Sequence, residues 1–189
     1  MRIVLVSFSA FHTVCKTVII PQKTTEDFSI SHLCDVPLFA PFLADAHARE
    51  WGHLYANWNQ DTALDDFQME KGSSDLPTTW AIHHHQSGAL MGSVSLRMDD
   101  LPGHPDLNPW LASLFVFPEF RSLGLGRILV QKALDVLRYH QFPHAFLFTE
   151  NKISFFSKFN FCIHSQTKAE GHEVTLMKWT NPKPINDKS

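Results

Sequence analysis

The chain has 189 residues, of which 44% are hydrophobic and 12% are aromatic, and its formal net charge is -3. This length suits one domain, and the apolar content is sufficient for a packed core, which excludes intrinsic disorder for the body of the chain. The charge balance excludes the polybasic surface that is typical of nucleic-acid-binding proteins.

The N-terminal segment begins with Met1-Arg2 and an apolar run that resembles a short signal peptide. His12 interrupts this run, no small-x-small cleavage site follows, and the run is too short to cross a bilayer. A signal peptide stays an alternative, but we predict an N-terminal extension over residues 1–27, a domain over 28–180 and a flexible tail over 181–189.

The 3 cysteines are far apart and include no C-x-x-C pair. A disulfide framework or a structural zinc site is therefore not expected. We predict reduced thiols in a cytoplasmic protein that does not associate with a membrane.

Periodicity indicates a mixed α/β chain from Phe28 onward. Alternating side chains predict a strand over 28–33, followed by a helix over 38–55 that Asp35 would cap. A second helix is expected from Asp61 to a glycine end at Gly72.

The second half of the sequence contains mainly strand-like apolar runs around one long helix. Strands are expected over 78–85, 89–98, 110–117, 145–149 and 173–179, with helices beginning near Gly124 and over 153–159. The helix after Gly124 has apolar residues on one face only, which is typical of a helix that covers a sheet.

A glycine turn joins the apolar strand to this helix. Pro118 ends the strand, and Gly124 and Gly126 allow a tight turn without a Cβ in front of a ligand. Unpaired N–H groups and the positive end of the helix dipole would make the turn a cradle for a diphosphate. An ordinary turn is the alternative, since a Walker A loop is absent from the sequence and Leu129 stands where a dinucleotide fingerprint needs a third glycine.

The segment Val116-Phe-Pro118 followed by Arg121, Gly124 and Gly126 resembles the [QR]-x-x-G-x-[GA] acyl-CoA motif of the GNAT acetyltransferase superfamily. The segment 147–161 resembles the second motif of that family, with Asn160-Phe161 where the family has Gly-Phe. The resemblance implies a central, mostly antiparallel twisted sheet with a splayed strand pair, flanked by helices. It also implies an N-acetyltransferase that moves an acetyl group from acetyl-CoA to an amine by direct attack, without a metal, as a monomer or homodimer.

The resemblance places the cofactor along the strand and the turn, held mainly by backbone groups. The expected cofactor-binding residues are Phe115, Val116, Phe117, Arg121, Ser122, Leu123, Gly124, Leu125, Gly126, Arg127 and Asn151. Backbone amides near Phe115 to Phe117 would stabilise the oxyanion. Asn151 would bond the pantetheine arm, or alternatively cap the following helix.

An alkyl amine has a pKa near 10, so a base is expected on the acceptor side. The candidates for base or amine binding are Glu50, His53, Asp99, Asp100 and His104. Phe156 stands where many relatives have a tyrosine that reprotonates the leaving thiolate. A CoA-binding module with weak or no activity is therefore the alternative function, and a nucleotide-binding protein is a third.

The run His83-His84-His85 suggests a metal site at first sight. On a strand, however, His83 and His85 share a face without a carboxylate or cysteine at ligand spacing. We therefore predict a solvent-facing hairpin strand and no metal.

Overall fold

The computed structural model describes residues 27–68 and 76–182. The extension 1–27 apart from its last residue, the expected helix end at Gly72, and the tail beyond Pro182 lie outside the described residues. Among the described residues, none of the helices combines the length and apolar character that a membrane crossing requires.

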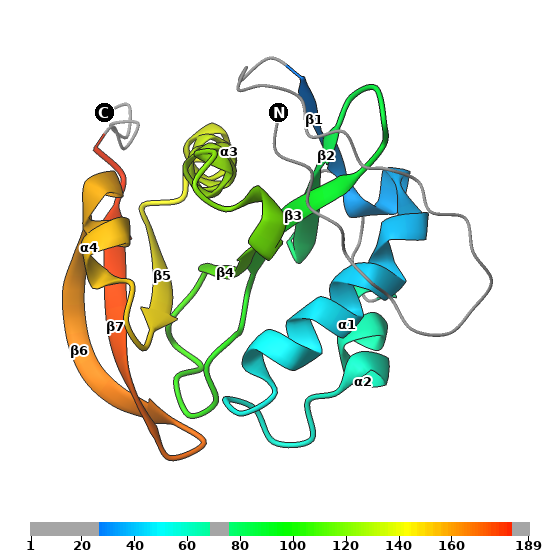
Figure 1. Ribbon diagram of the computed structural model, residues 1–189. Coiled ribbons are helices and arrows are strands. Elements are labelled where there is room, and N and C mark those ends of the chain that lie inside the picture. The colour runs from blue at the N-terminus through cyan, green and yellow to red at the C-terminus, as the bar shows by residue number, and fades with distance from the viewer. Residues whose placement is uncertain (1–26, 69–75, 183–189) are drawn as a thin grey trace.

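A seven-stranded sheet forms the centre of the molecule, with the strand order β1-β2-β3-β4-β5-β7-β6 (Figure 1). Its strands are β1 (Phe28–His32), β2 (Thr78–His84), β3 (Leu90–Arg97), β4 (Trp110–Val116), β5 (His144–Thr149), β6 (Phe161–Ala169) and β7 (His172–Thr180). All neighbouring pairs are antiparallel except β4 and β5, which are parallel. The expected mixed α/β fold with a mostly antiparallel sheet is confirmed.

The sheet splays between β4 and β5. The only residue pair that joins these two strands is Trp110 with Phe146, at the beginning of β4. Beyond this point the strands diverge and leave a gap in the described part of the sheet (Figure 1). The expected splayed strand pair is therefore present.

Helices cover both faces of the sheet. The helices are α1 (Ala40–Trp51), α2 (Gln60–Gln68), α3 (Leu125–Tyr139) and the short α4 (Ile153–Phe156). α3 buries one apolar stripe, which includes Leu129, Val130 and Leu134, in a core shared with Trp80 and Ile82 of β2. The intervening Ala81 points to the opposite face, where it packs in a second core with α1 and α2.

The helix caps differ from those expected. Asp35 lies inside a 3-10 turn, Leu33–Asp35, and no side-chain cap bond precedes α1. α2 is capped by Asn59, whose Oδ1 accepts hydrogen bonds from the N–H groups of Asp61 and Thr62. Asp61 is therefore in the first turn of α2, where its charge suits the helix dipole.

β6 was absent from the expected elements. It is an edge strand whose side chains are exposed from Cys162 to Gln166, so its sequence lacks a buried apolar face. Pairing with β7 along its whole length, from Phe161 opposite Trp179 to Ala169 opposite His172, establishes it instead.

Gly92 permits the close approach of β3 to β4. A Cβ atom at this position would lie 2.3 Å from the carbonyl oxygen of Phe115. Here the ladder is also irregular, and Ser113 has a φ of 51°. The irregularity turns the second half of β4 away from β5, because a bulge bends its strand.

Candidate functional site

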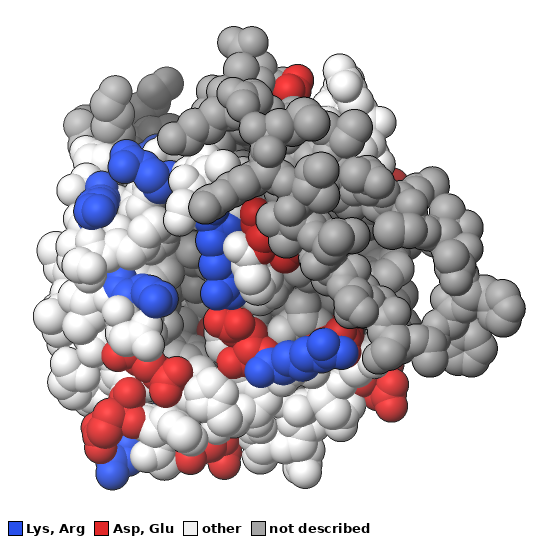
Figure 2. Space-filling model, viewed as in Figure 1, with Lys and Arg blue, Asp and Glu red and all other residues white. Residues whose placement is uncertain are grey.

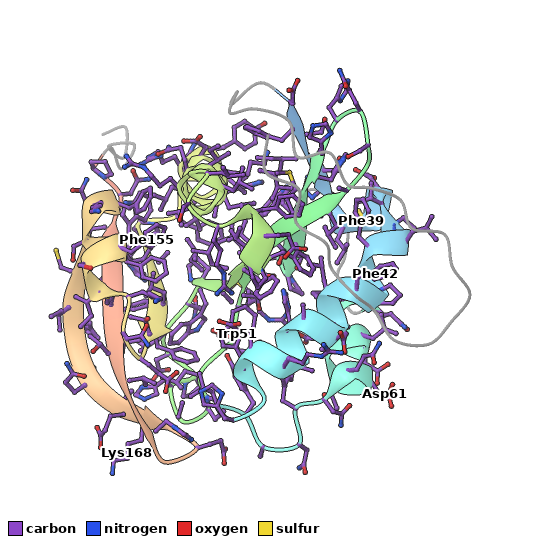
Figure 3. The ribbon with its side chains drawn as sticks, in the orientation of Figure 1. Phe39, Phe42, Trp51, Asp61, Phe155 and Lys168 are labelled. Carbon is purple, nitrogen blue, oxygen red and sulfur yellow. The ribbon has the colours of Figure 1, made fainter. Side chains whose placement is uncertain are left out.

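A pocket with a volume of about 1090 Å³ extends along the gap between β4 and β5. Its walls are the end of α1 with the following loop, the loop after β3, β4 with the turn before α3, and the end of β5 with α4. Figure 2 shows basic side chains at the centre of this face and acidic side chains below them. Figure 3 shows Phe155 on the α4 side and Trp51 on the α1 side, and both line the pocket.

The turn before α3 presents backbone donors to this pocket. Ser122 and Gly124 have φ angles of 66° and 83°, and Gly124 is the N-cap of α3. For the N–H groups of residues 122–126, no backbone acceptor is found within 27–68 and 76–182. A Cβ at Gly124 would meet nothing within 4 Å, so the space in front of the turn is open. Such consecutive N–H groups at a helix N-terminus suit an anion.

Arg121 is held at the end of β4. Its Nε donates a hydrogen bond of 2.9 Å to the carbonyl oxygen of Val116, and its guanidinium lies 3.5 Å from a carboxylate oxygen of Glu50. Glu50, an expected candidate base, is thus paired with an arginine. The exposed Arg127 in the first turn of α3 also lines the pocket and adds positive charge beside the 122–126 turn.

The backbone of β4 provides fewer free amides than expected. The N–H of Phe117 donates to the carbonyl oxygen of Met91, and neither Phe117 nor Leu123 lines the pocket. Since N–H groups alternate sides along a strand, those of Leu114 and Val116 face the gap. Leu114 was not among the expected residues.

The α4 side contains Asn151 and Phe156. Asn151 is exposed and lines the pocket, and the N-cap of α4 is Lys152, so the alternative that Asn151 caps this helix is wrong. Phe156 is buried at the pocket wall against Phe155 and Phe161. The nearby Ser157 hydroxyl donates to the carbonyl oxygen of Ile153.

Within the described pocket, Asp100 is the carboxyl group whose pKa is shifted furthest from its ordinary value. Removal from water raises the pKa of Asp100 to about 7, with Asp66 and Asp99 adding to the rise, while the positive charge of Arg97 and a hydrogen bond from Tyr55 oppose it. The Tyr55 hydroxyl donates to Asp100 Oδ1 over 3.1 Å. Burial, and then the Asp100 charge, raise the pKa of Tyr55 well above its usual value, so this hydroxyl remains a donor.

Arg97 lines the same pocket as Asp100, and its positive charge acts on that carboxyl group. Its guanidinium pairs with the carboxylate of Asp66 on α2. The carboxyl groups of Asp66 and Asp100 therefore share one partly buried arginine, which leaves Asp100 without a full counter-charge. A carboxyl with a pKa near neutrality suits proton abstraction at physiological pH.

The other expected acceptor-side residues also line the pocket, at its rim. His53 Nε2 lies 3.2 Å from Glu150 Oε2, and His104 Nε2 lies 3.3 Å from Thr167 Oγ1. Asp99 is exposed. Of the expected candidates, only Asp100 combines a place in the pocket with a strongly raised pKa.

Known proteins resemble this chain in sequence and in fold. A mycothiol acetyltransferase from Beutenbergia cavernae is 31% identical over 91 residues, which is 47% of this chain and 29% of the relative's length. A putative acetyltransferase from Acinetobacter baylyi has a TM-score of 0.65 at 11% identity, covering 85% of this chain and 97% of its own. A spermidine N-acetyltransferase from Vibrio cholerae has a TM-score of 0.62 at 13% identity, covering 86% and 98% respectively.

The family assignment depends on the sequence match, since structures at such low identity show the fold alone. The profile of the acetyltransferase (GNAT) family matches residues 41–161, from α1 to the first residue of β6, and this range is well over half of the chain. It includes the strand, the turn and the second motif. The chain belongs to the acetyltransferase (GNAT) family.

Proposed function

We propose that this protein is an N-acetyltransferase that moves an acetyl group from acetyl-CoA to an amine. The observation that carries the proposal is that the Asp100 carboxyl, with its raised pKa, shares a pocket with the N–H groups of the 122–126 turn, for which the described residues offer no backbone acceptor. One end of the pocket suits a diphosphate, and the other suits an amine that must lose a proton.

The cofactor would lie along the gap in the sheet. Its pyrophosphate would accept hydrogen bonds from the turn, with Arg127 adding charge. Its pantetheine arm would extend beside β4 and use the outward backbone groups of Leu114 and Val116 as a neighbouring strand does. One of these N–H groups would stabilise the oxyanion that forms on the thioester carbonyl.

The acceptor would bind on the side of Asp100. An ammonium group enters, Asp100 takes one proton, and the neutral nitrogen attacks the carbonyl carbon of the thioester. The carbon–sulfur bond breaks, and the second proton of the nitrogen goes to the departing sulfur through solvent. Phe156 has no transferable proton, and a CoA thiol leaves readily as thiolate, so the proposal needs no side-chain acid here.

The acidic side chains of the pocket support the proposal that the acceptor is a cation. Asp99 and Asp100 both line the pocket. The spermidine N-acetyltransferases that share the fold are named for an amine substrate. A cytoplasmic location and a monomeric or homodimeric state complete the proposal and stay predictions from the sequence.

The test is thiol release from acetyl-CoA with a panel of primary amines and polyamines. We expect release that depends on the amine and is lost in Asp100→Asn. If folded protein that binds CoA released no thiol with any amine, the proposal of catalysis would fail.

A CoA-binding module without turnover is the second candidate, and Phe156 is the observation that favours it. This reading predicts a thermal shift with acetyl-CoA, no transfer, and no gain from Phe156→Tyr. Transfer that increases in Phe156→Tyr would instead show that the pocket performs the reaction and lacks only an acid.

A further inference from the structure

Three metal-ligating side chains from separate elements meet at the rim of the pocket. His53 lies in the loop after α1, Glu150 follows β5 directly, and His172 is the first residue of β7. Their ligand atoms all lie within 4.8 Å of one another. The ends of α1, β5 and the start of β7 lie together in the lower half of Figure 1.

The two carboxylate oxygens of Glu150 face different imidazoles. Oε2 lies 3.2 Å from His53 Nε2, and Oε1 lies 3.8 Å from His172 Nδ1. The two rings stand edge to face with their centroids 5.0 Å apart. A tetrahedral metal holds nitrogen and oxygen ligands at about 2.0–2.2 Å, so its ligand atoms lie roughly 3.3–3.6 Å apart. Small side-chain movements would bring the three groups from their present separations, all within 4.8 Å, to that spacing.

We propose that His53, Glu150 and His172 form a binding site for a divalent transition metal ion of the Zn²⁺ type. Two imidazoles and one carboxylate suit Zn²⁺, Co²⁺ or Ni²⁺, whereas Mg²⁺ and Ca²⁺ prefer oxygen ligands. Three protein ligands leave a coordination position for water.

The cluster is accessible to an ion without unfolding. The side chains of His53, Glu150 and His172 are 44%, 35% and 46% exposed. His53 and Glu150 line the pocket, and His172 lies just outside it. A bound ion would therefore fix the loop after α1 to β5 and β7 at the entrance of the pocket, across the gap in the sheet.

The alternative is a cluster without a metal, in which imidazole N–H groups donate to the Glu150 carboxylate and form an ion pair with it when a ring is protonated. The two readings differ in their pH dependence, because metal binding requires neutral imidazoles and is favoured as pH rises, whereas the ion pair is favoured as pH falls. A metal titration at pH 7.5 and at pH 5.5 separates them.

The experiment is calorimetric titration of tag-free, chelator-treated protein with ZnCl₂, accompanied by thermal melting and by the visible spectrum with CoCl₂. We expect one equivalent of Zn²⁺ at pH 7.5, a higher Tm, tetrahedral Co²⁺ absorption, and little binding at pH 5.5. Removal of a residue that only orients a metal ligand lowers metal affinity by roughly 10–100-fold. His172 would bind the metal directly, so His172→Ala should lower the affinity for Zn²⁺ by about 100-fold or more.

The control is His85→Ala, which removes an exposed histidine of the β2–β3 hairpin and should leave Zn²⁺ binding unchanged. Binding that is lost in His85→Ala, equal binding in His172→Ala, or no binding to the unmodified protein would overturn the assignment. These readouts are independent of acetyl transfer, so their failure leaves the proposed function untouched.

Discussion

Tyr55 donates a hydrogen bond to Asp100 over 3.1 Å, although 45 residues separate them in the sequence. The bond joins the loop after α1 to the loop after β3. It fixes the orientation of the one carboxyl group in the described pocket whose pKa is raised to about 7. The part of the pocket around Asp100 therefore depends on two loops that the fold brings together.

Replacement of Asp100 by asparagine should remove the proposed base. Because general base catalysis contributes at least about 100-fold, kcat/KM for an amine should fall by that factor, while the affinity for CoA stays the same. Thiol release and calorimetry measure the two quantities. Asp106→Asn, an exposed change in the same loop outside the pocket, serves as the control. Equal activity of both variants would exclude Asp100 as the base.

Replacement of Tyr55 by phenylalanine should shift the pH profile of kcat/KM to higher pH. Of the groups that face Asp100, Tyr55 and Arg97 lower its pKa, and Asp66 and Asp99 raise it. Activity should increase with pH as the carboxyl loses its proton, with a midpoint near 7 in the unmodified protein. Loss of the Tyr55 bond moves the midpoint upward. A midpoint that moves downward would contradict the geometry.

Replacement of Gly124 by glutamate should abolish CoA binding, since a charged side chain would occupy the open space before the turn. Gly88→Glu is a matched control, because both glycines have positive φ angles, 83° and 66°, and open space where a Cβ atom would lie. Both variants should lose about 1 kcal/mol of stability from backbone strain. Only Gly124→Glu should lose the thermal shift with CoA, and a shift retained there would place the cofactor elsewhere.

Replacement of Gly92 by alanine should distort β4. The new methyl group would lie 2.3 Å from the backbone oxygen of Phe115, and backbone cannot move aside as a side chain does. We expect a loss of about 1–3 kcal/mol in the free energy of unfolding, measured by urea denaturation. CoA affinity should fall as well, because the misplaced strand end leads into the turn. If Gly92→Ala were as stable as the unmodified protein, β3 and β4 would be able to move apart without a loss of folding free energy.

Protonation of His47 should destabilise the protein in acid. Burial, and then the charge of Arg97, lower the pKa of His47 from 6.5 to about 3. The neutral His47 side chain makes its full contribution to the free energy of unfolding above pH 6.5. This contribution is lost as the pH falls toward 3, at about 1.4 kcal/mol per pH unit. His47→Gln, which can keep a bond to Ser93, should show a shallower dependence between pH 6.5 and 4. The exposed His164→Gln should behave like the unmodified protein.

The sequence predicted the elements that carry strong local signals. The apolar run before Pro118, the glycine turn and the one-sided apolar pattern of α3 all appear where they were expected, because each follows from local geometry. β6 was missed because an exposed edge strand has no apolar face, and only its partner β7 shows where it lies.

The site was less accessible to sequence reasoning than the fold. Asp99 and Asp100 are adjacent in the chain, yet Asp99 is exposed, whereas Asp100 accepts a hydrogen bond from Tyr55 and is subject to the charge of Arg97. The cluster of His53, Glu150 and His172 has no motif, since its members come from three distant segments. These residues come together only through tertiary packing, so the hydrophobic periodicity of the sequence does not predict their contacts.

The single pair between Trp110 and Phe146 has a mechanical consequence. Apart from this pair, packed side chains connect the two halves of the sheet. Trp110 and Phe146 share a core with Leu101 and Val174, and the helix α3 lies in another core with Leu111 and Leu147. Relative motion of the halves about that helix changes the width of the opening between them. A molecule bound in the opening would contact both halves and limit their relative motion. The sheet is therefore expected to be more rigid when the opening is occupied than when it is empty.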